Sequence, residues 1–231
     1  MLTVSIYMTT PLTAARHESS SVSLKVPLSS ITLTTSRSGH NYCWTVTQKI
    51  DMSTLFSIGH GNKSFEEFEE ELRSFGIQYL IDVRSKPYSK WNPTFNQEAL
   101  RALLQKRGFV YVYMGDTIGG MPTDPSCYTD GHIDYAKVRE KPFFQEGFAR
   151  LLTAAEKELK VAVMCSESEP EKCHRSKLIG QELLKHGISM NHIVGVGKSQ
   201  SQETVMAILT KGAGTMTLFG EETFVSRKSY S

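Results

Sequence analysis

The sequence predicts an α/β fold in which a mostly parallel β-sheet is covered by helices on both faces. Short, nearly continuous apolar runs, typical of strands buried on both sides, alternate at least four times with amphipathic helical segments. Polar and reactive side chains follow directly after those runs, as expected at the carboxyl edge of such a sheet. The length of 231 residues suits a single domain with a Ser/Thr-rich N-terminal extension.

The extension, residues 1–50, differs in composition from the rest of the chain. It is rich in Ser and Thr, carries four basic side chains and one acidic one, and has no sustained helical or strand period. Such a segment is expected to be disordered, to serve as an organellar transit peptide, or to arise from a misassigned start, with Met52 as the natural initiator. We therefore expect the α/β domain over residues 51–199.

The domain opens with a predicted strand over 54–58 and a helix over 65–75. Ser64 and Glu67 form a capping box at the start of this helix, and Gly76 supplies its end. A second buried strand is predicted over 77–83.

A helix that Asn96 is placed to cap and that Gly108 ends leads to a third strand over 109–113. Residues 115–133 form a loop longer than most connections in compact domains, which favours a binding or lid segment.

A helix over about 143–159 then leads to a strand over 161–164. A further helix ends at Gly187 and precedes a last parallel strand over 192–196. Residues 200–231 favour no single structure; a helix and a strand packed on the domain are one interpretation.

The composition excludes several classes of protein. Hydrophobic residues make up 39% of the chain and no apolar run reaches eighteen residues, which argues against a membrane span and against a wholly disordered chain. A formal net charge of +2 gives no global basic field for non-specific nucleic-acid binding. The four cysteines lie in a chain long enough to bury its own core, so we expect no disulfide framework and a reducing, cytoplasmic location.

Candidate site residues collect after the predicted strands. In chain order they are Gly59, His60 and Gly61; Asp82, Arg84 and Ser89; Gly119 and Gly120; Cys165 and Glu167; and Gly195, Gly197 and Lys198. The last group is a weak signal, since it matches neither a dinucleotide fingerprint nor a phosphate-binding loop.

The most informative segment is 164–175, between a strand and a helix. Cys173, His174 and Arg175 would lie at the helix start, where a thiolate or a bound anion is favoured. Arg175 could hold an oxyanion, and His174 or His60 could move protons near neutral pH.

Other interpretations of this segment stay open. Cys165 could be a small buried residue, and the cysteines could hold zinc with His174 and His60, although their spacing lacks the short pairs of structural zinc sites. A phosphatase-like loop is disfavoured, because Glu171 stands where that mechanism needs arginine. A persulfide-carrying cysteine needs only an exposed thiolate beside cations.

The loop after the second strand has two interpretations as well. Asp82 and Arg84 could form a structural ion pair or contact a ligand. Tyr88, Trp91 and Phe95 could stack on a base or pack over the edge of the core.

Taken together, these motifs resemble the domain-of-unknown-function family 488. The motifs are Ser57 to Gly61, Asp82 to Arg84 with Pro87 to Ser89, Gly119–Gly120, Cys165 with Glu167, Cys173 to Arg175, and His192–Ile193. The resemblance covers about residues 54–197 and implies a cytosolic α/β domain of a bacterial or archaeal type, with no established reaction. Gly61 stands where many relatives have a serine, which puts in doubt a role of that hydroxyl with His60.

We expect a cysteine-dependent hydrolase or transferase that acts on a small anionic or nucleotide-like substrate, without a metal or cofactor. Cys165 or Cys173 would be the nucleophile, Glu167 or His174 the acid and base, and Arg84 with Arg175 the anion clamps. The predicted catalytic residues also include His60, and the predicted substrate contacts include Asp82, Ser89, Gly59, Gly119 and Gly120. The alternatives are a binding module for nucleic acid or a modified base, and a metal-stabilised structural domain. The sequence gives no oligomeric state.

Overall fold

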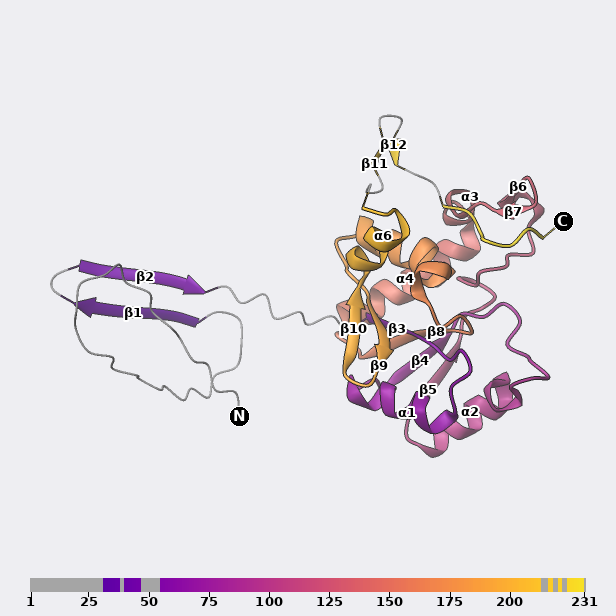
Figure 1. Cartoon of the computed structure of the whole chain (residues 1–231), viewed down its shortest axis with the longest axis horizontal. Coiled ribbons are helices and arrows are strands. Elements are labelled where there is room, and N and C mark those ends of the chain that lie inside the picture. Colours follow the sequence, from indigo (N-terminus) through magenta and orange to yellow (C-terminus); the bar gives the residue numbers. More distant parts are fainter. Residues whose placement is uncertain are drawn as a thin grey trace. The chain divides into compact units, whose positions relative to one another are not determined.

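The structure is a computed structural model of the full chain (Figure 1). It describes residues 31–37, 40–46, 55–212, 216–217, 220–221 and 224–230. The chain divides into two compact units, Met1–Asp51 and Met52–Ser231. In the described part of the chain, no helix combines the length and the apolar character needed to span a membrane.

The first unit contains one antiparallel hairpin of strands β1 (Ile31–Arg37) and β2 (His40–Val46). We predicted no regular element here, and the difference has a local reason. The β1 segment is rich in β-branched threonine, which favours extended backbone even where the apolar pattern is weak. The expected disorder of residues 1–30 lies outside the described residues.

The second unit is built on a six-stranded sheet, which confirms the predicted mostly parallel architecture. Its strands are β3 (Leu55–Gly59), β4 (Tyr79–Asp82), β5 (Val110–Tyr113), β8 (Val161–Cys165), β9 (Asn191–Gly195) and β10 (Lys198–Ser201). Their spatial order is β10-β9-β3-β8-β4-β5, and only β10 runs antiparallel to its neighbour. The Gly195–Lys198 segment is the turn of the β9–β10 hairpin.

Helices cover both faces of this sheet, as predicted (Figure 1). On one face, α1 (Phe65–Ser74) and α2 (Gln97–Lys106) bury a core that includes Phe68, Leu72, Leu100 and Leu104. On the other face lie α3 (Tyr135–Arg139), α4 (Pro142–Glu156), the π-helical turn η4 (Arg175–Gly180) and α5 (Gln181–Lys185), around Phe144, Phe148, Leu178 and Leu183. Strands β3, β4, β5 and β8 contribute residues to both cores.

The helix ends follow the local signals with one exception. Ser64 and Glu67 form the predicted capping box at α1, and Gly76 takes the left-handed conformation after it, with φ of +65°. Asn96 occupies the N-cap of α2 but makes no capping bond. Its side-chain oxygen instead accepts from the backbone N–H of Ser89, which fixes the preceding loop.

Short elements complete the unit. They are η1 (Pro93–Phe95), η2 (Pro125–Cys127), β6 (Tyr128–Thr129), β7 (His132–Ile133), η3 (Pro170–Lys172), α6 (Gln202–Leu209), β11 (Met216–Thr217) and β12 (Gly220–Glu221). Residues 224–230 return to the long loop, where Ser226 donates to the carbonyl of Ile133 and Tyr230 donates to that of Gly131. The C-terminal segment therefore packs on the predicted binding loop.

The neighbouring strands β4 and β8 define the position of the site. After β4 the chain turns to the face covered by α2, whereas after β8 it turns to the face covered by η4 and α5. A crevice opens between strand ends whose connections diverge in this way, and ligands of open α/β sheets bind there.

Candidate functional site

An open cavity of about 250 Å³ lies at this crevice. Its lining residues are Arg84, Ser85, Lys86, Gly120, Met121, Tyr135, Cys165, Ser166, Glu167, Lys172, Cys173, His174, Ser226, Arg227, Lys228 and Tyr230. Five of these side chains are cationic and one is a carboxylate, so the cavity favours an anion.

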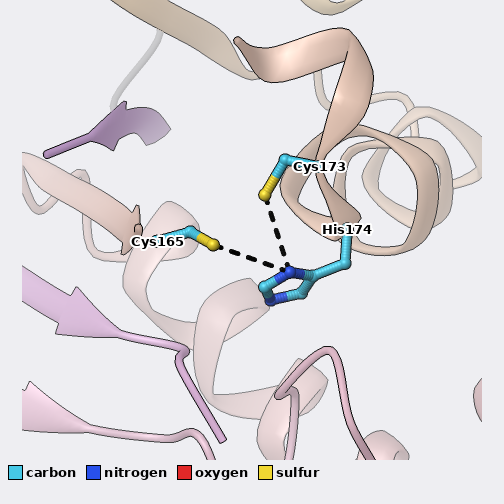
Figure 2. Close-up of side chains that lie close together, drawn as sticks. All are labelled: Cys165, Cys173 and His174. Atoms are coloured by element: carbon cyan, nitrogen blue, oxygen red, sulfur yellow. Dashed lines mark hydrogen bonds between the residues drawn. The ribbon is translucent and has the colours of Figure 1, made fainter. Parts of the chain in front are cut away.

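Cys165, Cys173 and His174 meet on one wall of the cavity (Figure 2). Cys165 ends β8, and Cys173 and His174 come directly before η4. Nδ1 of His174 points at both thiols, 3.6 Å from Sγ of Cys173 and 3.9 Å from Sγ of Cys165. All three side chains are largely buried. The fold thus unites the two cysteines and the histidine of the most informative sequence segment.

The surroundings shift the pKa values of the two thiols in opposite directions. Burial raises the pKa of the Cys173 thiol, but a hydrogen bond from Cys165, the positive charge of Arg175 and the contact with His174 outweigh it and hold that pKa well below its usual range. The hydrogen bond to Cys173, together with burial, raises the pKa of Cys165 well above its usual range. Of the two thiols, Cys173 is therefore the more acidic one and Cys165 the less acidic one.

Arg175 donates two hydrogen bonds to the sulfur of Cys173. Its backbone N–H and its Nε donate to Sγ of Cys173, at 3.5 and 3.3 Å. The remaining guanidinium nitrogens donate to Oγ of Ser57 and to the carbonyl oxygen of Glu167. Arg175 is fully buried and does not line the cavity, so it stabilises the sulfur and the loop. Its predicted contact with substrate finds no geometric support.

Gly120 positions His174. A Cβ at Gly120 would lie 2.7 Å from Cγ and Nδ1 of the ring, so only glycine lets the loop pack this closely on the imidazole. Nε2 of His174 is buried and has no hydrogen-bond partner among the described residues. Packing, and not a hydrogen bond at Nε2, therefore fixes the ring.

Asp82 and Arg84 form the structural ion pair that the sequence allowed. The Asp82 carboxylate is fully buried and accepts from Nε and Nη2 of Arg84, at 2.9 and 2.6 Å, and from the Tyr111 hydroxyl at 2.7 Å. Asp82 does not line the cavity, whereas Arg84 lines its edge. Of the two predicted contacts, only Arg84 is placed to meet a ligand.

His60 is engaged away from the thiols. Its Nδ1 lies 2.9 Å from the carbonyl oxygen of Gly61, its Nε2 lies 3.4 Å from Nη1 of Arg84, and its ring stacks on Phe95. Both contacts fit the neutral tautomer in which Nδ1 carries the proton and Nε2 accepts from Arg84. Burial and the neighbouring Arg84 lower the pKa of His60 to about 4. His60 positions Arg84 and is not among the lining residues.

The other predicted residues divide between the cavity rim and the backbone. The Glu167 carboxylate lies on the rim, where it pairs with Arg227 at 3.4 Å. Gly59 and Gly119 allow close backbone packing, since a Cβ on either would lie 2.0 Å from a carbonyl oxygen. Ser89 accepts hydrogen bonds from the N–H groups of Trp91 and Asn92 inside its own loop. These last three do not line the cavity.

Sequence reasoning missed the C-terminal wall of the cavity. Ser226, Arg227, Lys228 and Tyr230 come from the segment 200–231, for which we predicted no single structure and no site residue. The paired basic residues Arg227 and Lys228 were the one available signal, but no local pattern says that they return to the strand ends.

The same wall could hold a metal ion. The ligand atoms of Cys165, Cys173 and His174 all lie within 4.8 Å of one another. Two features of the site disfavour a divalent cation. Arg175 places a positive charge beside Cys173. Among the described residues, Nε2 of His174 also has no acceptor of the kind that orients almost every metal-bound histidine.

One family model matches the chain. The family model described as "Domain of unknown function DUF488" matches residues 64–181, about half of the chain. No curated protein and no solved structure matches the chain.

Proposed function

The chain belongs to the DUF488 family, whose description assigns no reaction, and from the site geometry we propose that it is an enzyme in which the Cys173 thiolate attacks a small anionic or nucleotide-like substrate. One observation carries the proposal. Cys173 lines a cationic cavity, and its Sγ accepts hydrogen bonds from the backbone N–H and from Nε of Arg175. A thiolate in such surroundings is a nucleophile at neutral pH.

The charge of the cavity supports an anionic substrate. Among the lining cations, Arg84 is paired with Asp82, Lys172 with Glu169, and Arg227 with Glu167. Lys86 and Lys228 have no carboxylate partner within the described residues. These two lysines would therefore attract and neutralise a phosphate or carboxylate group of the substrate.

The size of the cavity limits what it encloses. A volume of about 250 Å³ is smaller than the pockets that bury drug-sized ligands. It suits a small anion, or one group of a larger molecule that extends outside.

The chemistry we propose is a displacement in two steps. The Cys173 sulfur forms a bond to the electrophilic atom of the substrate, the bond to the leaving group breaks, and the Cys165 thiol or His174 gives the leaving group a proton. Water or a second acceptor then attacks the same atom and gives its proton to the group that lost one, Cys165 or His174. The bond to sulfur breaks, and the Cys173 thiolate is restored. Water makes the protein a hydrolase, and another acceptor makes it a transferase. A reducing compartment such as the cytoplasm would keep both cysteines as thiols.

Alkylation by a neutral and an anionic reagent tests the proposal. Iodoacetamide should modify Cys173 with an apparent pKa well below about 8.5, the usual thiol value. The cationic cavity should also raise the iodoacetate-to-iodoacetamide rate ratio above that of N-acetylcysteine, and Lys228→Ala should lower it. Mass spectrometry separates the sites, and Cys127, whose pKa burial raises, is the internal control. Equal reactivity of Cys173 and Cys127 would contradict the proposal.

A metal-stabilised domain is the second candidate, favoured by the three convergent ligands. Treatment with EDTA separates the two functions. The nucleophile proposal expects an unchanged melting temperature and unchanged Cys173 alkylation. A lower melting temperature and alkylation that begins only after chelation would instead identify a metal site.

A further inference from the structure

The loop between β4 and η1 carries the two most exposed aromatic side chains of the described residues. Trp91 is 85% exposed and Tyr88 is 76% exposed, whereas Phe95 at the end of the same loop is buried. We expected these aromatics either to stack on a base or to pack over the core. Only Phe95 packs on the core. The next most exposed aromatic, Tyr230, lines the cavity.

The backbone of this loop is held in place. Its hydrogen bonds join Ser89 to Asn96, Trp91 to Ser89, and Gln97 to Pro87, at 2.6 to 3.1 Å. The two exposed rings are therefore displayed by an ordered backbone, and a ligand that stacks on them need not order the loop first.

The loop is also basic. Lys86 and Lys90 flank Tyr88, and no acidic residue occurs between Arg84 and Asn96. Nζ of Lys90 lies 4.8 Å from the centroid of the Trp91 ring. Cations and aromatic faces that alternate in this way match a chain of phosphates and bases.

The loop leads directly into the cysteine cavity. Lys86 lines that cavity, and it also lines a neighbouring hollow of about 470 Å³ together with Met121 and Tyr230. Trp91 is five positions after Lys86 in the sequence, a distance of at most about 18 Å along an extended chain. A ligand on the loop can therefore be longer than the small cavity and still reach Cys173.

We propose that the segment Lys86–Trp91, with Tyr230, binds a short stretch of single-stranded nucleic acid and presents one of its groups to the cysteine cavity. Bases stack on Trp91 and Tyr88, and Lys86 and Lys90 contact the phosphates. A duplex fits less well because its base faces are already stacked. This inference deepens the proposed function and rests on it for the reaction, but strand binding itself does not require the thiolate.

Fluorescence anisotropy of the full chain with a labelled twelve-nucleotide oligo(dT) or oligo(U) tests the binding. The affinity should fall with salt, and a matching duplex should bind more weakly. Trp91→Ala should weaken binding about tenfold through lost stacking. Lys90→Ala should reduce the magnitude of the salt slope by about one.

Matched variants keep the test specific. Val110→Ala alters an exposed apolar residue and Lys157→Ala an exposed lysine. Both residues lie near the amino-terminal ends of the strands, away from the loop, so both variants should leave binding unchanged. Cys173→Ser should keep the affinity, and Trp91→Ala should keep the alkylation profile of Cys173, so failures of binding and of chemistry are distinguishable. Absence of single-strand binding at low salt, equal binding by Trp91→Ala, or a preference for anionic lipid vesicles over either oligonucleotide would overturn the proposal.

Discussion

The ends of β4 and β8 lie side by side, yet they use charged and reactive side chains for opposite purposes. At β4, Asp82 is on the face covered by α1 and α2, and Arg84 and Tyr111 satisfy its carboxylate. At β8, Cys165 is on the other face, where it lies beside Nδ1 of His174 and lines the cavity. One end is a closed hydrogen-bond network and the other keeps a reactive atom in contact with a cavity.

The difference teaches that polar residues after a strand do not by themselves identify a site. What decides their role is whether partners inside the protein satisfy them. Arg84 and His60 are held by Asp82, Phe95 and Gly61, so they support the crevice. Cys173 accepts hydrogen bonds from Arg175 and is still among the residues that line the cavity.

The largest loss of stability should come from removing Asp82, the acceptor shared by Arg84 and Tyr111 at the end of β4. Asp82→Ala leaves the buried Arg84 and the Tyr111 hydroxyl without their acceptor and should lower the free energy of unfolding by about 3 to 5 kcal/mol. Urea denaturation measures the loss. Glu98→Ala, which breaks an exposed ion pair with Arg101, is the control and should cost less than about 1 kcal/mol. Equal costs would mean that the β4 end is not a closed network.

Acid should weaken the same network through His60. Burial and Arg84 lower its pKa to about 4, and burial with Arg175 lowers that of His192 to about 4. The unfolded chain, with a histidine pKa near 6.5, then binds more protons than the folded chain, so stability is present above pH 6.5 and is lost as the pH falls toward 4. Each histidine should contribute up to about 1.4 kcal/mol per pH unit in this window.

The variant His60→Gln isolates that contribution. Between pH 6.5 and 5, the slope of unfolding free energy against pH should fall by roughly one proton, since His192 still titrates. An unchanged slope would show that His60 does not contribute to the pH dependence of stability.

Much of this comparison could be predicted from the sequence, because its signals are local. Apolar runs and glycine stops located β3, β4, β5, β8 and β9, and the segment 164–175 identified the thiol cluster. The alternation of residues along a strand also separates the faces of Asp82 and Cys165.

The rest depends on contacts between residues far apart in the chain. One of the two partners of Asp82, Tyr111, comes from β5, the ring that stacks on His60 comes from η1, and one cavity wall comes from residues 226–230. No spacing rule encodes such contacts. Ranking His60 beside Cys173 was therefore reasonable from their positions after strands, although the geometry gives them different surroundings.

A smaller effect should follow from disturbing the packing that holds His174. Gly120→Ala places a Cβ 2.7 Å from the ring and should cost about 1 to 3 kcal/mol of stability while it slows Cys173 alkylation. Gly195→Ala is the matched control, because its Cβ meets only the Lys198 side chain at 3.8 Å. If both variants retain full stability and reactivity, packing on Gly120 does not position the histidine.

The smallest effect in free energy tests the division of roles at the β8 end. Cys165→Ala removes a hydrogen bond that lowers the pKa of Cys173, so less thiolate should be present at pH 6. Alkylation of Cys173 should then slow by roughly three- to tenfold at that pH, which corresponds to the net worth of one ordinary hydrogen bond, and should recover above pH 9. Cys127→Ala, remote from the pair, should change neither rate. Faster alkylation of Cys173 in Cys165→Ala would reverse the assignment, because it would mean that Cys165 carries the negative charge and raises the pKa of its neighbour.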